Sequence, residues 1–110
     1  MGVTRTDLFS VVQNELAIAA KAFAHPARIA IIQHLIKTKG CINGDLVQEL
    51  GLAQATISQH LRELKDIGII QGTIEGSRVS YCINPIRWEE IKEQFTTIFN
   101  QYRPPAGDCC

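Results

Sequence analysis

The segment QATISQHLREL, residues 54–64, carries the side chains whose chemistry is most informative in this sequence. On a helix with about 100° per residue, Ile57, Leu61 and Leu64 fall in one narrow sector, which must face a core. Gln can pair with adenine, Arg with guanine or phosphate, and Ser or Thr with either. The segment therefore predicts a helix that can read the edges of DNA bases. Its outward side carries Ala55, Thr56, Ser58, Gln59, Arg62 and Glu63.

Two helices joined by a tight turn are expected to position these side chains. Asn43 can cap a first helix over residues 44–50. Residues 51–53 form a turn of the length that joins the two helices of a helix-turn-helix. The second helix is expected over about 54–66, because Gly68 can adopt the left-handed C-cap conformation behind it.

A β-hairpin is expected to follow this pair of helices. Residues 69–74 and 78–83 are predicted strands around a turn at 75–77, because apolar and polar residues alternate along the second of them. Ser77 and Arg78 at the tip of such a wing can reach an adjacent phosphate or the minor groove. The residues expected to contact DNA are therefore Gln54, Thr56, Ser58, Gln59, His60, Arg62, Ser77 and Arg78.

Two more helices are expected before the helix-turn-helix. Thr4-x-x-Asp7 resembles a capping box, and apolar residues recur at steps of three and four over about 5–23. The next helix is predicted to start at His25-Pro26, with His25 as its cap, and to stop at Gly40. Its predicted buried stripe consists of Ile29, Ile32, Leu35 and Ile36.

The other two histidines are interpreted as structural or peripheral. His60 lies at the edge of the core sector of its helix, so we interpret it as a packing or phosphate-side residue rather than a catalyst. His34 is interpreted as a helix-surface residue.

The last helix is predicted to begin at Asn84-Pro85 and to end before residues 103–105. It carries an apolar seam that a small monomer cannot cover, and the first helix offers a matching stripe. Packing both against their symmetry mates would bury them and place two reading helices about one DNA turn apart, which predicts an inverted-repeat operator. The predicted dimer interface comprises Leu8, Val12, Leu16, Trp88, Ile91, Phe95, Ile98, Phe99 and Tyr102.

These elements predict a mainly α-helical winged helix-turn-helix with a small β-hairpin. The order is helix, helix, strand, helix, helix, hairpin, helix, with the first, short strand at Cys41-Ile42. We expect one domain over residues 1–103, with terminal helices for dimerisation, and a flexible tail over 104–110. No apolar run is long enough to cross a bilayer, and the N-terminus lacks a secretory pattern, so we expect a cytoplasmic location.

The charge balance limits how such a protein can bind DNA. The formal net charge is zero, with 11 basic and 11 acidic residues, although residues 1–40 hold five Lys and Arg against two Asp and Glu. Non-specific attraction to phosphates should be weak and easily screened by salt. Geometry and two-fold symmetry must therefore supply much of the binding.

The motifs resemble those of the ArsR/SmtB family of bacterial transcriptional repressors, over roughly residues 16–92. The resemblance rests on four runs: His25-Pro26-x-Arg28, Leu50-Gly51-Leu52-x-Gln54-x-Thr56-Ile57-Ser58-x-His60-Leu61-x-x-Leu64, Gly68-Ile69-Ile70 and Gly76-Ser77-Arg78. It implies a homodimeric repressor of its own operon, released by an effector, with its recognition helix at 54–63 and its wing at 76–78. Where the family commonly has Ser before this helix, the chain has Ala53, which removes a cap that contributes about 1 kcal/mol.

Cysteines are the candidate effector ligands. In metal-sensing relatives of this family, cysteines stand at positions that correspond here to Ile42 and Gly44. A shift of one residue would make Cys41 the first ligand, but the second would be Asn43, a poor ligand for a thiophilic ion. A zinc site in the last helix needs histidines that this helix lacks. The adjacent thiols of Cys109 and Cys110 can bind a trivalent metalloid such as arsenite, with Cys41 as a third ligand. The alternative is a tail whose thiols have no role.

Cys82 offers a second hypothesis. It lies on the second predicted strand of the hairpin, and the short strand that contains Cys41 is expected to pair with it. A redox switch between these two thiols is conceivable, whereas two half-buried strand cysteines are more often inert.

Two classes of function remain open at this stage. The first is a dimeric, sequence-specific DNA-binding repressor that responds to arsenite, another thiophilic ion or a redox signal. The alternative is a winged-helix module that binds protein or RNA, which the neutral charge balance favours. An enzyme is not expected, because the sequence has no paired carboxylates, activated nucleophile or phosphate loop.

Overall fold

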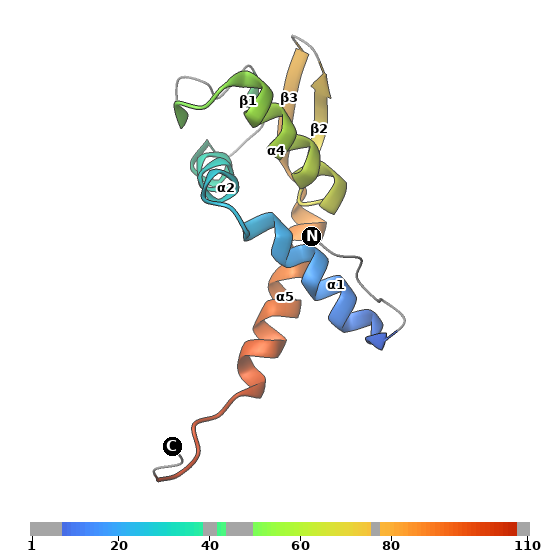
Figure 1. Cartoon of the computed structure of the whole chain (residues 1–110), viewed down its shortest axis with the longest axis vertical. Helices are drawn as coiled ribbons and strands as arrows, with labels where there is room; N and C mark the ends of the chain where they lie inside the picture. The colour runs from blue at the N-terminus through green and yellow to red at the C-terminus, as the bar shows by residue number, and fades with distance from the viewer. Residues whose placement is uncertain (1–7, 39–41, 44–49, 76–77, 108–110) are drawn as a thin grey trace.

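The computed structural model describes residues 8–38, 42–43, 50–75 and 78–107. A winged body contains α2, α4 and a three-stranded sheet, and α5 extends away from it with α1 lying across its first turns (Figure 1). The predicted helix over 44–50 lies outside the described residues except for Leu50. The helices and strands are α1 (Val11–Ala20), the 3₁₀ turn η2 (Lys21–Phe23), α2 (Pro26–Thr38), β1 (Ile42–Asn43), α4 (Gln54–Ile67), β2 (Ile70–Glu75), β3 (Arg78–Ile83) and α5 (Pro85–Gln101).

The predicted start of the first helix is wrong. Helix α1 begins at Val11, because Ser10 and Gln13 form a complete capping box. The Ser10 hydroxyl accepts from the Gln13 backbone N–H at 3.0 Å, and the Gln13 side chain accepts from the Ser10 N–H at 3.0 Å. These bonds satisfy two helix-end donors at once, which makes Ser10 a better starting point than Thr4. The predicted end is nearly right, since η2 carries the helical path to Phe23.

Helix α2 starts as predicted, but one side of it was misassigned. The His25 imidazole accepts from the Ala27 N–H at 3.0 Å, which confirms His25 as the cap before Pro26. Ile32 and Leu35 are buried, Ile29 is half-buried, and Ile36 is 49% exposed. The buried side is centred on Ala27, Ile31 and Leu35, successive positions four residues apart, and Ile36 falls outside it.

The sheet has the order β1-β3-β2, and both pairs are antiparallel. The predicted hairpin strands are confirmed to within one residue. Strand β1 pairs through Ile42 with Tyr81, so the expected pairing of the short strand with the second hairpin strand is also confirmed. Tyr81 is buried, and it joins the sheet to the core.

Helix α4 packs between α2 and the hairpin (Figure 1). Its apolar side contributes to the hydrophobic core. Ile57, Leu61 and Leu64 are all buried, as the helical wheel predicts. Gly68 ends the helix with φ 96°, and its N–H donates to the Leu64 and Lys65 carbonyls. At the other end Ala53 is the N-cap and offers no side-chain oxygen to the first turn.

Helix α5 starts at the predicted cap. The Asn84 side-chain oxygen accepts from the backbone N–H groups of Ile86 and Arg87 at 3.1 and 3.2 Å, and Pro85 occupies the first turn. The Arg87 side chain donates to the Ile67 carbonyl at 3.3 Å, which ties α5 to the end of α4. None of the helices in the described ranges is both long and apolar enough to cross a membrane.

Candidate nucleic-acid interface

The outward side of α4 presents the hydrogen-bonding residues identified in the sequence. We call Gln54, Thr56, Ser58, Gln59 and Arg62 the reading face; Ser58 is half-buried and the other four are exposed. The polar outer side of the helix is thus opposite a buried inner side made of Ile57, Leu61 and Leu64, with His60 as its one polar member among the described residues.

Two hydrogen bonds order the reading face before any ligand binds. Gln54 Nε2 donates to Ser58 Oγ at 3.1 Å, one helical turn away. Gln59 Nε2 donates to Glu63 Oε1 at 3.1 Å with the same spacing. Such pairs restrict side-chain rotamers, which reduces the entropy lost when these side chains bind a ligand.

His60 does not lie with the reading face. It is 9% exposed, its ring centroid is 4.6 Å from that of His25, and its Nδ1 accepts from Arg28 Nε at 3.2 Å. Of the two roles considered for His60, the structure favours packing. A neutral ring with a free Nδ1 lone pair is required for this contact.

Burial lowers the pKa of His60 below its usual value of 6.5, and the nearby His25 and Arg28 lower it further. The imidazole of His60 therefore binds a proton more readily in the unfolded chain than in the folded chain. The resulting contribution to stability is complete above about pH 6.5 and is lost as the pH falls through the folded-state pKa. Protonation of His60 at acidic pH therefore destabilises the folded state.

Arg28 is the centre of a polar cluster that sequence reasoning missed. Its guanidinium contacts His60, forms an ion pair with Glu63 and donates to the Lys21 carbonyl, while only 14% of its side chain is exposed. We call Lys21, His25, Arg28, His60 and Glu63 the Arg28 cluster. The sequence contained a signal for it, since Arg28 and His60 both belong to the motifs that carry the family resemblance, but nothing showed that they meet.

The wing is only partly described. Ser77 lies outside the described residues, and β3 begins at Arg78, which is opposite Glu75 in the register. The backbone of the hairpin therefore places position 78 at its tip, as expected. A contact from this residue to DNA stays a prediction.

The terminal helices and the residues next to them present most of the predicted seam to solvent. Leu8, Val12, Ile98, Phe99 and Tyr102 are exposed large apolar residues, with Phe99 at 73%. Leu16, Trp88 and Phe95 are half-buried, and Phe23 packs edge-on against the rings of Trp88 and Phe95. Ile91 differs, because it is buried in the core of its own chain.

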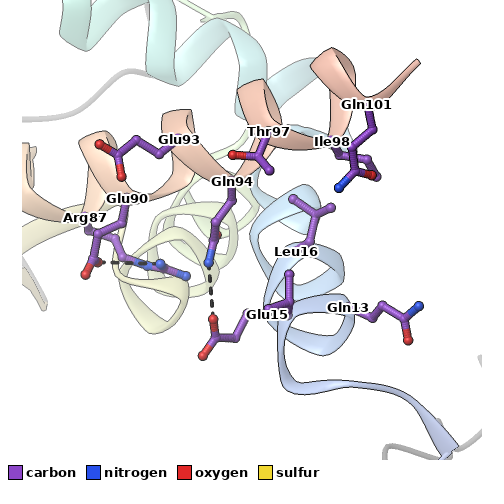
Figure 2. Close-up of a pocket in the computed structure, with 11 residues that line it drawn as sticks. Gln13, Glu15, Leu16, Arg87, Glu90, Glu93, Gln94, Thr97, Ile98 and Gln101 are labelled. Carbon is purple, nitrogen blue, oxygen red and sulfur yellow. Dashed lines mark hydrogen bonds and ion pairs between the residues drawn. The ribbon is translucent and has the colours of Figure 1, made fainter. Parts of the chain in front are cut away.

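A groove separates α1 from α5 within this surface. Leu16 and Ile98 point into it, and Gln94 Nε2 bridges it by donating to Glu15 Oε2 at 3.2 Å (Figure 2). Glu90 and Glu93 on α5 line its polar edge. The two helices thus form one continuous surface with an apolar centre and a charged border.

The candidate effector ligands Cys41, Cys109 and Cys110 lie outside the described residues. Cys82 is half-buried on β3, where Gln71 Nε2 is 3.9 Å from its sulfur. Across residues 8–38, 42–43, 50–75 and 78–107, no three His, Cys, Asp or Glu side chains gather into a group that could hold a metal ion.

A winged helix-turn-helix whose second helix presents amides, a hydroxyl and a guanidinium to solvent belongs to a class of nucleic-acid-binding proteins. Comparison with known proteins identifies the family. Residues 25–71 match the family model for the bacterial regulatory proteins of the arsR family. The chain is also 31% identical, over 91 residues, to the HTH-type transcriptional regulator YgaV of Escherichia coli, an alignment that covers 83% of this chain and 89% of that protein.

Two further similarities agree with this result. The biofilm growth-associated repressor of Xylella fastidiosa is 28% identical, with 78% of this chain and 75% of that protein covered. A crystal structure of an ArsR family transcriptional regulator has the same fold, with a TM-score of 0.59 at 21% identity over 81% of this chain and 99% of that one. The protein belongs to the ArsR family of DNA-binding transcriptional regulators, which are not enzymes.

Proposed function

We propose that this protein is a homodimeric repressor that binds an inverted-repeat operator through α4 and the hairpin wing. The observation that carries the proposal is the reading face, where Gln54, Thr56, Gln59 and Arg62 are exposed above a fully buried apolar side. These groups suit the major groove, which displays a distinct hydrogen-bonding pattern for each base pair. The repressor named among its relatives supports the direction of regulation. Such a protein would work in the cytoplasm, with the DNA.

Exposure of the terminal helices supports the homodimer. Phe99 and Tyr102 are 73% and 71% exposed, and Val12 on α1 is 64% exposed. Apolar surface of this extent on a small chain is typical of an interface, and a two-fold axis would bury the same patch from both copies. Each half of the operator would then be contacted by one α4, so that weak contacts are made twice.

The neutral charge keeps a second function open, in which the same face of α4 binds protein or RNA. A band-shift titration with the DNA upstream of the protein's own gene, run at two salt concentrations, separates the two. Sequence-specific retardation that weakens with salt supports binding to a DNA operator. Absence of retardation at low salt would favour the interaction module.

Arg62→Ala is expected to weaken operator binding by roughly 10- to 100-fold, because each subunit loses a guanidinium that contacts guanine or phosphate. Lys37→Ala on α2 is the matched control, since it also removes one exposed cation but lies off both the reading face and the terminal helices. Fluorescence anisotropy with operator DNA at several salt concentrations measures both. Equal losses for the two variants would mean that only net charge matters, and would contradict the proposed role of α4.

For the effector, we propose a thiophilic species, with arsenite as the first candidate and Cys109, Cys110 and Cys41 as its ligands. The neighbouring thiols of Cys109 and Cys110 support the proposal, because a trivalent metalloid binds two or three sulfurs. Arsenite is expected to protect two or three thiols from a colorimetric thiol reagent and to release the operator. The Cys109→Ser/Cys110→Ser double variant should lose both effects, and Cys82→Ser should lose neither. If arsenite protects no thiol, a redox signal becomes the better candidate.

A further inference from the structure

The Arg28 cluster joins three parts of the chain at one side chain. Arg28 lies on α2, the Lys21 carbonyl that accepts from its Nη1 is on η2, and its other two partners, His60 and Glu63, are on α4. A guanidinium is planar and carries five donors in a rigid fork, so it can hold three acceptors in one geometry. A lysine at this position has a single flexible ammonium and cannot reproduce that arrangement.

Glu63 connects the Arg28 cluster to Gln59 on the reading face. Glu63 forms an ion pair with Arg28 through Oε2, and its other oxygen, Oε1, accepts from Gln59 Nε2 at 3.1 Å. Arg28 therefore restrains the Glu63 carboxylate, and the carboxylate restrains the amide of Gln59. Because Gln59 is exposed and amide orientation decides whether Gln can pair with adenine, this connection bears on base selectivity.

The contact between Arg28 and His60 depends on the protonation state of the His60 ring. Arg28 Nε donates to His60 Nδ1 at 3.2 Å, and a protonated imidazole has no lone pair left to accept. Protonation would also place a positive charge beside Arg28 and within 4.6 Å of the His25 ring centroid. The other charged groups around the adjacent hollow are Lys21 on η2 and the carboxylates of Glu63 and Asp66 on α4.

We propose that Arg28 is a positioning residue for the recognition helix, holding α4 against α2 through His60 and orienting Gln59 through Glu63, and that protonation of His60 releases the first of these contacts. Operator affinity then decreases as the pH falls below neutrality. This direction is opposite to that of a histidine that binds phosphate, whose protonation strengthens binding to DNA. The proposal rests on operator binding by α4, and it also predicts properties of the free protein.

The test uses the full-length protein and four variants. Operator affinity is measured from about pH 8 to about pH 5.5, with circular dichroism to show that each variant stays folded. His60→Asn places an oxygen near the position of Nδ1, which accepts a hydrogen bond at every pH. Arg28→Lys keeps the positive charge and removes the planar guanidinium with its five donors. His25→Asn keeps a helix cap and removes the neighbouring ring, and His34→Asn is the control for a histidine on α2 outside the cluster.

We expect the wild type and His34→Asn to lose operator affinity by about tenfold over this pH range, and His60→Asn to give a flat profile. Arg28→Lys should bind more weakly throughout and should discriminate less against a changed base at the position that Gln59 contacts. His25→Asn should keep a pH-dependent profile. If His60→Asn retains the wild-type profile, or Arg28→Lys discriminates between bases as the wild type does, the proposal is wrong.

Two measurements on the free protein separate this proposal from the proposed function. Nitrogen chemical shifts of the His60 ring should report an unprotonated Nδ1 at neutral pH that titrates below 6.5. Amide hydrogen exchange in α4 should speed up in acid for the wild type, at all pH values for Arg28→Lys, and not in acid for His60→Asn. If these hold while no DNA is bound, the cluster positions α4 for another partner and only the operator function fails. If exchange in α4 is the same in Arg28→Lys as in the wild type, the positioning role is overturned whatever the DNA result.

Discussion

Phe99→Asp is expected to convert the dimer into monomers and to reduce operator affinity by at least about 100-fold. Phe99 is 73% exposed on α5 and its ring stacks on that of Phe95, with centroids 6.1 Å apart. In a dimer this surface would be buried, and an unpaired carboxylate buried at an interface costs several kcal/mol. A monomer contacts only half of the operator, so it loses the benefit of two linked contacts. Sedimentation velocity at micromolar protein and a band-shift titration measure the two effects.

Ile86→Asp provides the matched control for this change. Ile86 is also an exposed apolar residue on α5, at 75%, but it lies in the first turn on the side away from the seam. A carboxylate there is favourable with respect to the helix dipole, so dimerisation and folding should be unaffected. A Phe99→Asp protein that still sediments as a dimer would show that the interface lies elsewhere.

Gly72→Ala is expected to destabilise the protein by about 3 kcal/mol or more, lowering the melting temperature by more than about 10 °C. Gly72 has φ 130°, a conformation that L side chains rarely adopt, and it pairs with Tyr81 across the hairpin. A Cβ at this position would overlap the Ser80 carbonyl oxygen and lie 2.8 Å from Tyr81 Cα. These are backbone atoms that cannot rotate away, so the β2–β3 pairing itself must open.

Thermal and urea denaturation measure this loss, and Gly51→Ala is the comparison. Gly51 has φ 68°, and no atom of the described residues lies within 4 Å of the place that an added Cβ would take, so alanine there is expected to meet only the left-handed backbone strain of about 1 kcal/mol. Gly72→Ala should therefore be clearly less stable than Gly51→Ala. Equal stabilities would mean that the hairpin relaxes around the new methyl group, contrary to the close approach of the two strands.

Local signals predicted most of the fold. Helix α4 was predicted to within one residue at each end, because its apolar period and the glycine at position 68 lie within the helix and its C-cap. The hairpin strands and the Asn84-Pro85 start of α5 were predicted for the same reason. The first helix was misplaced because the prediction rested on Thr4-x-x-Asp7, whereas the capping box of the structure is formed by Ser10 and Gln13.

The residue types on the outward side of α4 could also be inferred from the sequence. A wheel of 3.6 residues per turn separates Ile57, Leu61 and Leu64 from the polar residues, whatever the rest of the chain does. The charge balance, the helix-turn-helix spacing and the aromatic seam of the last helix are likewise properties of short stretches. These features are sufficient to predict a winged-helix DNA-binding protein.

Contacts between distant segments required the three-dimensional fold. Arg28 and His60 are 32 positions apart, and no periodicity within either helix shows that their side chains meet. Ile91 was assigned to the dimer seam, yet it is buried within its own chain because α5 packs on the core at that turn. Short-range pattern determines which side of a helix is apolar, whereas the packing of helices against one another determines what each side contacts. The Arg28 cluster, and with it the proposed proton-sensitive positioning of the recognition helix, is a consequence of that packing.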